Sequence, residues 1–330
     1  MRSCRQGGLV DIESLAALDG LLWLRTGHAV AHAFNFSQSF VSRSARRCAD
    51  VFGVELKKAE SEWCLDGDLM LLNLERKVHQ HVRWQKGLPL RLEAQHWSGP
   101  LLCAPSPSGW ITGNLNFLEY HRPLHLLALG VIDAWVASYP DVPFGDDSDI
   151  VAIPLSRMPM RLVVNQGHPL LALGRHLTFA DVAQYPCLPL PDGAFPQFQA
   201  ALQHCGLWQG SGLAPMSGRR GGQEQGCVED LLVGFSTPLA LPLYGEAVVE
   251  LPLELPMVVG DALLIRREFS DSPQTHDLAA QLRQRLRKLA LTTPDVVVLE
   301  HSVCSSFEAA AGLNAWDGRG VGVSGAANIP

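Results

Sequence analysis

Apolar residues recur at helical spacing in three consecutive stretches near the start of the chain. In the third stretch, which follows Ser37, apolar side chains fall on one face and glutamine, serine and arginine on the other. Ser37 can cap the first turn of such a helix, and Gly53 can adopt the left-handed conformation that ends it. The pattern predicts helices over residues 11–24, 27–34 and 37–53, which is the order of a helix-turn-helix unit.

The polar face of the third helix has chemistry that suits DNA. Glutamine and arginine side chains can hydrogen-bond base edges in a major groove, and serine and arginine can bind phosphates. Residues 37–58 contain five lysines and arginines against two acidic residues, although the whole chain has a net charge of −7. By periodicity alone, an ordinary amphipathic surface helix is the simpler interpretation.

A short hairpin and a long helix are predicted next. Residues 57–65 can form a wing, and Asp66 or Asp68 can cap a helix that continues to about Lys86. The apolar residues of this helix form one stripe: Leu71, Leu74, Val78 and Val82. Such a stripe suits pairing with the same helix of a second chain, and packing on its own domain is the alternative.

From residue 90 onward, short apolar segments alternate with helical ones, which is typical of an α/β sheet. Strands are predicted at 90–94, 110–119, 132–137, 150–154, 160–164, 187–190, within 234–241, at 261–266 and at 296–299. Helices are predicted at 124–129, 177–184, 196–205, 228–233 and 275–289. We expect the glycine-rich segment 210–226 to be a loop, and residues 291–330 to form a disordered tail.

The composition is that of a globular protein, with 47% hydrophobic and 18% charged residues. A length of 330 residues suffices for two or three domains. The eight cysteines include no C-x-x-C pair, which indicates reduced thiols. No apolar run approaches the length of a membrane span and no signal-peptide pattern follows Met1, so we expect a cytoplasmic protein.

Several segments together resemble the LysR-type transcriptional regulators. Ser37-Gln38-x-x-Val41-Ser42-Arg43-x-x-Arg46, followed by Gly53-Val54-x-Leu56, is similar to the recognition helix of that family. Later segments resemble the effector domain of the family in the same order: 126–136, Val163-Val164-x-x-Gly-His168-Pro169-Leu170, Leu177-x-Phe-Ala180-Asp181-Val182, and Val233-Gly234-Phe235 running into Leu241-Pro242. The resemblance covers about residues 10–290.

The resemblance implies an N-terminal all-α winged helix-turn-helix with a linker helix, then a two-lobed, periplasmic-binding-protein-like α/β effector domain. The DNA-binding domain would span 1–65 and the dimerising linker helix 66–87. The effector domain would span 88–290, with lobe I at 88–163 and 262–290 and lobe II at 164–261. The implied partners are double-stranded promoter DNA, a small-molecule effector bound between the lobes, and further copies of the chain in a homodimer or homotetramer.

Site residues follow from the same resemblance. DNA contacts are expected from Gln38, Ser39, Ser42 and Arg43, with phosphate contacts from Arg46 and Lys58. In the cleft, hydroxyl and imidazole groups are candidates to hold a small anionic effector such as a carboxylate: His96, Ser98, Thr112, Ser236 and Thr237. An ordinary capping role is the alternative for each of them.

Other constellations are weaker. The pairs His28/His32 and His121/His125 share a helical face but lack a third ligand at suitable spacing, so no metal or other cofactor is predicted. Segment 234–238 lacks the second glycine of a nucleophile elbow, and no phosphate-binding or dinucleotide-binding loop occurs, so no enzymatic activity is expected. Cys187, Cys205 and Cys227 are the candidates for a thiol switch. The simpler interpretation of each is a buried cysteine with a structural role.

Three functions therefore remain open. The first is a bacterial DNA-binding regulator of the LysR type that responds to a small molecule. The second is a small-molecule-binding protein of the periplasmic-binding type without a DNA function. The third is a degenerate regulator that has lost its ligand response.

Overall fold

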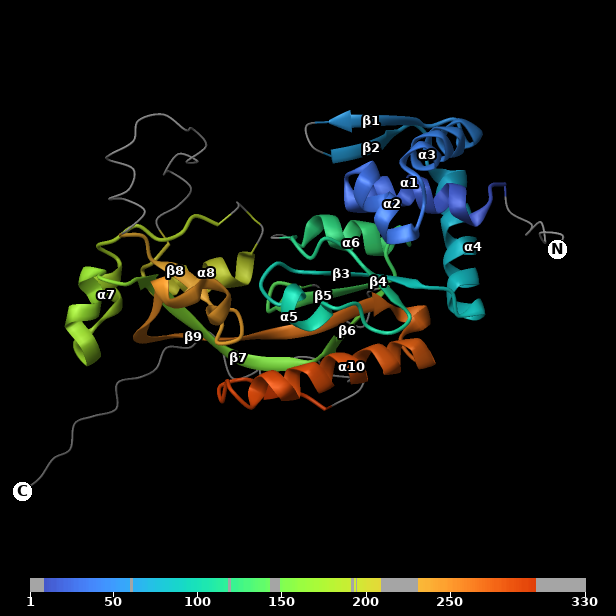
Figure 1. The fold of residues 1–330 in the computed structure, drawn as a ribbon. Coiled ribbons are helices and arrows are strands. Elements are labelled where there is room, and N and C mark those ends of the chain that lie inside the picture. The colour runs from blue at the N-terminus through green and yellow to red at the C-terminus, as the bar shows by residue number, and fades with distance from the viewer. Residues whose placement is uncertain are drawn as a thin grey trace, which may run out of the picture.

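A computed structural model describes residues 9–59, 62–117, 120–142, 149–190, 193, 195–208 and 231–300. The chain forms a helical N-terminal domain with a β-hairpin, then one long helix, then an α/β domain with two lobes (Figure 1). This is the fold class predicted from the sequence, which is confirmed. No described helix combines the length and the apolar character that crossing a membrane requires.

The N-terminal domain forms where its capping residues predict. Its elements are α1 (Ile12–Leu24), α2 (Gly27–Phe34), α3 (Gln38–Phe52) and the antiparallel hairpin of β1 (Glu55–Ala59) and β2 (Glu62–Asp66). The side chains of Asp11, Thr26 and Ser37 each accept a backbone hydrogen bond at the start of a helix, and Gly53 ends α3 at φ 66°. All but two residues of α1 are buried, so α1 is the central helix of this domain.

Helix α4 (Met70–Lys86) packs on the rest of the chain with its polar side. Besides Leu72 and Trp84, its buried residues are all polar or charged: Glu75, Arg76, His79, Gln80 and Arg83. The opposite side is apolar, with Met70 60%, Leu71 51%, Leu74 54% and Val78 49% exposed. The predicted apolar stripe therefore faces outward over most of its length.

The α/β domain is built on one continuous sheet of eight strands. The strands are β3 (Leu90–Ala94), β4 (Trp110–Thr112), β5 (Ala134–Tyr139), β6 (Ile150–Pro154), β7 (Ser156–Asn165), β8 (Gly234–Ser236), β9 (Val248–Arg266) and β10 (Val297–Val298). The order is β10-β7-β9-β5-β3-β4, with β6 also paired to β9 and β8 to β7. The two lobes are joined because β9 pairs with β7 along residues 248–259 and with β5 along residues 260–265.

Helices cover both lobes of this sheet (Figure 1). They are α5 (Gly99–Cys103), α6 (His121–Ala128) and α10 (Pro273–Ala290) in lobe I, α7 (Phe179–Val182) and α8 (Pro196–His204) in lobe II, and the short 3₁₀ helices η1 (Pro169–His176), η2 (Leu241–Ala247) and η3 (Arg267–Phe269). Thr178 and Asp181 form a capping box at α7, and Ser272 caps α10, which begins two residues before the predicted start at 275.

Several predicted elements of the effector domain are wrong. The strand expected at 110–119 ends at Thr112, and the segment 187–190 forms only an isolated bridge from Cys187 to Val233. Residues 231–233 are not helical, and the strand predicted at 261–266 is only the end of β9, which has 19 residues. Pro252 and Pro256 argue against a central strand in the sequence, but β7 and β9 are joined there by an irregular ladder with register shifts that leave room for them.

Part of the expected tail is folded. β10 pairs with β7, Val296 is buried, and Arg283 Nε donates a hydrogen bond of 2.7 Å to the carbonyl of Leu299. Residues as far as Leu299 therefore pack on the α/β domain, beyond the predicted start of the tail at 291. The expected loop 210–226 and residues 301–330 lie outside the described part of the chain.

The N-terminal domain shares a hydrophobic core with lobe I. One cluster of buried residues joins Leu18 and Trp23 of α1 to Leu127, Ile132 and Trp135 of lobe I. A second cluster lies between the other face of the lobe I sheet and α10, and a third fills lobe II. The N-terminal domain is therefore fixed on lobe I by packing and not only by the chain that connects them.

Candidate DNA-binding face and effector cavity

The outer side of α3 is polar and exposed along its length. Val41, Ala45, Cys48, Ala49 and Phe52 are buried on the inner side. All five predicted DNA-contact residues of α3 are exposed: Gln38, Ser39, Ser42, Arg43 and Arg46. The structure therefore brings these five together on one side of one helix, which lies at the edge of the molecule away from lobe II (Figure 1).

Lys58, the sixth predicted contact, is exposed on the hairpin, and its ammonium lies 5.8 Å from the ring centre of Trp63. The same hairpin carries Glu62, whose carboxylate forms ion pairs with Arg25 and Arg122. Arg122 belongs to α6 of lobe I, and it also donates a hydrogen bond to the carbonyl of Leu22. The negative charge of Glu62 is thus used to hold the hairpin and α1 against lobe I.

A buried network of charges joins α1, α4 and lobe I. The carboxylate of Asp19 accepts hydrogen bonds from Arg76 Nε at 2.8 Å and from Arg91 Nη1 at 3.3 Å. Asp133 accepts bonds from both Arg83 and Gln80, and from the backbone N–H of Arg91. Burial lowers the pKa of Arg91 to about 10, so this guanidinium stays charged at neutral pH. Asp19 and Asp133 are thus each paired with an arginine, which is the condition under which a buried charge is tolerated.

Glu93 of β3 is a further buried acid at the same contact. Its Oε2 accepts a hydrogen bond of 2.7 Å from Trp23 Nε1, and its Oε1 accepts bonds from the N–H groups of Ala94 and Leu115. Burial nevertheless raises the pKa of Glu93 to about 7. Gly113 lies against this pair, and a Cβ at that position would overlap both the Glu93 carboxylate and the Trp23 ring.

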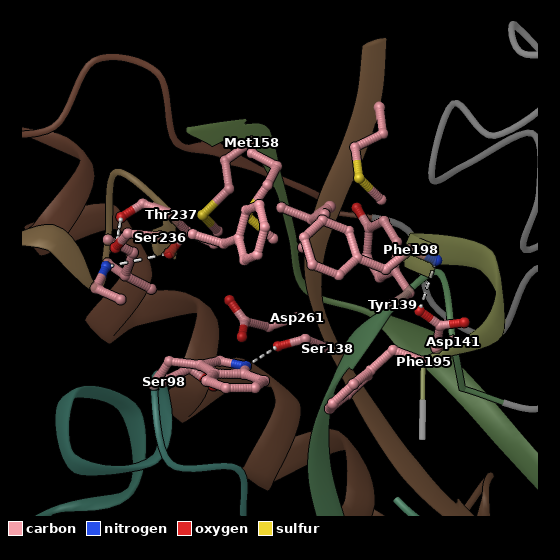
Figure 2. Close-up of a pocket in the computed structure, with 18 of the residues that line it drawn as sticks. Ser98, Ser138, Tyr139, Asp141, Met158, Phe195, Phe198, Ser236, Thr237 and Asp261 are labelled. Carbon is pink, nitrogen blue, oxygen red and sulfur yellow. Dashed lines mark hydrogen bonds between the residues drawn. The ribbon is translucent and has the colours of Figure 1, made fainter. Parts of the chain in front are cut away.

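A cavity of about 290 Å³ lies between the two lobes. Lobe I contributes residues 96–98, 138–141 and 260–261, and lobe II contributes side chains that include Phe198, Phe235 and Tyr244. Figure 2 shows aromatic rings and methionines on the walls, with the carboxylate of Asp261 among Ser98, Ser138 and Met158. The interior is therefore mostly apolar with a few polar groups, which is the usual character of a small-molecule site.

The structure places four of the five predicted effector residues at this cavity: His96, Ser98, Ser236 and Thr237. Thr112 is not among its lining residues, and its hydroxyl instead pairs with that of Ser106 at 2.7 Å. The reason is the register of β4, in which Thr112 lies opposite Leu92, four residues before His96 at the cavity.

Sequence reasoning missed the cavity residues that lie on crossing strands. Asp261 is a single acidic residue in the apolar run 257–265, and this signal could have found it. Tyr139, at the end of β5, donates a hydrogen bond of 2.6 Å to the carbonyl of Ser156. Only hydrogen fits at Gly260, because a Cβ there would overlap the Tyr139 hydroxyl and the Ser156 carbonyl. No short pattern predicts the roles of Tyr139 and Gly260, since these roles depend on the contact of β5, β7 and β9.

Most polar groups at the cavity already have partners. Trp97 Nε1 donates to Ser138 Oγ at 2.9 Å, and Thr237 Oγ1 accepts from the N–H of Ala240. Asp141 accepts the N–H groups of Gln197 and Phe198 at the start of α8, which ties lobe I to lobe II. Burial raises the pKa of Asp141, and these two N–H groups act in the opposite direction.

Asp261 and Ser98 form the polar end of the cavity, and each is 2% exposed. Asp261 Oδ2 accepts a hydrogen bond of 2.8 Å from Ser156 Oγ. Burial raises the pKa of Asp261, while the hydroxyls of Ser156 and Ser98 act in the opposite direction. Ser98 lies near this carboxylate but forms no hydrogen bond of standard geometry with any described residue.

The other candidate chemistries find little support. In the described ranges, no three His, Cys, Asp or Glu side chains come together as a metal site. Burial raises the pKa of Cys187 to about 11 and also raises that of Cys205, so neither is an activated thiolate. Cys227, the third candidate for a thiol switch, lies outside the described residues.

Comparison with known proteins agrees with this geometry. Residues 112–215 match the family model described as the LysR substrate binding domain. A search of curated protein sequences finds no match. The resemblance inferred from the sequence motifs is thus confirmed over residues 112–215.

Solved structures are similar to the chain over most of its length. The probable transcriptional regulator PA0477 from Pseudomonas aeruginosa aligns with 83% of this chain and 97% of its own, at 14% identity and a TM-score of 0.50. A full-length OxyR variant from Pseudomonas aeruginosa aligns with 83% of this chain and 95% of its own, at 16% identity and a TM-score of 0.48. Full-length CbnR, solved with its target DNA, aligns with 85% of this chain and 100% of its own, at 15% identity and a TM-score of 0.45.

Proposed function

We propose that this chain is a transcription regulator of the LysR type, in which a winged helix-turn-helix precedes a substrate binding domain. In this proposal α3 reads promoter DNA in the cytoplasm, and a small-molecule effector binds in the cavity between the lobes. The effector acts by its different affinity for two arrangements of the molecule. No chemical step is part of this function.

The observation that carries the proposal is the exposed polar side of α3. The N-terminal domain buries α1 against lobe I and α4, yet Gln38, Ser42 and Arg43 remain accessible on the outer side of α3. The side-chain amide of Gln38 can form two hydrogen bonds with adenine, and the guanidinium of Arg43 can bind guanine or a phosphate. Ser39, Arg46 and Lys58 would add contacts to the phosphates, which position the protein without reading sequence.

The apolar stripe of α4 supports assembly with a second copy. Leu71, Leu74 and Val78 are each about half exposed or more, on a helix whose polar side is buried. Buried polar groups and exposed apolar ones on one helix are the reverse of what a monomer favours. Pairing of α4 with the same helix of another chain would cover the stripe and place two α3 helices for two half-sites of DNA.

Two alternatives receive less support. A ligand-binding protein without a DNA function gives no role to the exposed side of α3, and its N-terminal segment would not need to share a core with lobe I. A regulator without a ligand response would not need a cavity, whereas this one has an aromatic lining and a buried serine hydroxyl without a well-formed partner.

The experiment that tests the proposal is a gel-shift titration of the full chain with duplex DNA from upstream of its own coding sequence. A discrete complex that weakens steeply as salt is raised is expected, because phosphate contacts release counterions. Equal binding to an unrelated duplex of the same length, or no complex at low salt, would contradict it.

A further inference from the structure

We propose that the effector of this chain is a compact aromatic amine, whose ammonium group binds the carboxylate of Asp261 at the polar end of the cavity. The inference rests on the proposed function of the cavity as the effector site, and it adds the chemical class of the ligand. It differs from the carboxylate expected from the sequence.

The charges around the cavity favour a cation. The described residues that line the cavity include two carboxylates, Asp141 and Asp261, and no lysine or arginine. The other titratable side chains among them are His96, Tyr139 and Tyr244. A carboxylate ligand would be buried beside like charge with no cation to pair it, and such burial is costly. An ammonium would instead favour the charged form of the Asp261 carboxyl, which burial disfavours.

The two acids are not equivalent. Asp141 is occupied, since its two oxygens accept the N–H groups that begin α8. Asp261 has hydroxyls beside it, from Ser156 and Ser98, and neither can neutralise its charge. Asp261 is buried without a neighbouring cation, so a ligand ammonium would stabilise its carboxylate more than it would that of Asp141.

The rest of the lining fits the body of such a ligand. Trp97, Phe195, Phe235 and Tyr244 line the cavity, and ring faces attract cations as well as apolar groups. Met158, Met160 and Met257 supply flexible thioether side chains that adapt to an irregular shape. A cavity of about 150 Å³ holds a benzene ring, so 290 Å³ has room for one ring with a short side chain.

Ser98 gives the site a second polar contact. Its hydroxyl is buried at the cavity without a hydrogen bond of standard geometry to a described residue. The hydroxyl lies beside the Asp261 carboxylate and keeps its oxygen lone pairs available to a donor on the ligand. An ammonium has three donors, so one group can meet both the Asp261 carboxylate and the Ser98 oxygen.

The test is isothermal titration of the full chain with three probes that share a phenyl ring and a short chain: 2-phenylethylamine, 2-phenylethanol and 3-phenylpropanoate. We expect the amine to bind at least tenfold more tightly than the alcohol, and the carboxylate to bind most weakly. Tighter binding of the carboxylate, equal binding of all three, or no binding of the amine in the millimolar range would overturn the proposal. This comparison uses the unaltered protein and so does not depend on the folding of a variant.

Two variants locate the contact. Asp261→Asn is expected to weaken the amine at least tenfold and to leave the alcohol nearly unchanged. Asp271→Asn, at an exposed acid beyond the end of β9, is the matched control and should change neither. If Asp261→Asn binds the amine as the unaltered chain does, Asp261 is not the contact and the proposal is wrong. Because no DNA is present, failure here is distinct from failure of DNA binding, which the gel shift measures without ligand.

Discussion

Trp23 Nε1 donates a hydrogen bond of 2.7 Å to Oε2 of Glu93, and this bond joins the helical N-terminal domain to the α/β domain. Trp23 is fully buried near the end of α1, and Glu93 lies in β3, five residues before Ser98 at the cavity. One strand therefore connects the effector cavity to the domain that carries α3.

Replacing Trp23 with phenylalanine removes the donor and keeps most of the apolar surface. We expect Trp23→Phe to lower the free energy of unfolding by about 1–3 kcal/mol, because a buried carboxylate oxygen loses its partner. The loss should be larger at pH 8 than at pH 5, since the charged form of Glu93 needs the donor more. Urea unfolding at both pH values measures this. Trp63→Phe is the control, because Trp63 Nε1 donates to a neutral carbonyl, that of Arg25, and its loss should not depend on pH.

Glu93 should also make stability depend on pH. Its folded pKa of about 7 lies above the ordinary value of 4.5, so the stabilisation by its proton is complete below pH 4.5 and lost as the pH rises through 7. The free energy of unfolding of the wild type minus that of Glu93→Gln should therefore fall by about 2–3 kcal/mol from pH 5 to pH 8. Urea titrations across this range give the difference, and a constant difference would show that Glu93 has an ordinary pKa.

Alanine should destabilise the protein at Gly113 but not at Gly27. A Cβ at Gly113 would overlap the Glu93 carboxylate, so Gly113→Ala should destabilise the protein by about 1–3 kcal/mol. Gly27 begins α2 with open space around it, and Gly27→Ala should be neutral or stabilise by up to about 1 kcal/mol. Thermal melting of both variants tests this, and an equal effect of the two would mean that the Trp23–Glu93 contact is looser than described.

The apolar stripe of α4 should control assembly. Leu74→Glu puts a charge in the middle of the stripe, so we expect the oligomer to dissociate while each chain stays folded. Light scattering after gel filtration measures the mass, and circular dichroism checks the fold. Leu291→Glu is the matched control, because this leucine is also exposed but lies beyond α10. If both variants keep the mass of the wild type, the stripe is not the interface.

The N-terminal domain was predictable from sequence because its signals are local. Capping residues such as Asp11 and Ser37, and Gly53 at a left-handed end, set α1 and α3 to the residue. The signals used for the α/β domain are of the same local kind, and they predicted helices that overlap α7 and α10, although not their exact bounds.

The sequence could not show what depends on contacts between distant segments. The first part of β9 contains two prolines and two glutamates, and it is a strand because β7 lies beside it. The polar side of α4 reads as solvent-exposed, yet Arg76 and Arg83 are buried because Asp19 and Asp133 of other elements pair with them. Asp261 likewise belongs to the cavity through the crossing of the two lobes, and Thr112 does not because the register of β4 places it opposite Leu92.

The most direct test of the central claim is fluorescence anisotropy of a labelled duplex from the chain's own upstream region, titrated with wild type, Arg43→Ala and Arg175→Ala at moderate salt. Arg43 is exposed on α3, and Arg175 is exposed on η1 of lobe II, so the two variants lose the same charge at different places. We expect Arg43→Ala to weaken binding about tenfold to a hundredfold, which corresponds to about 1–3 kcal/mol, and Arg175→Ala to bind as the wild type does. Equal affinity of all three proteins would contradict the claim that α3 binds the DNA.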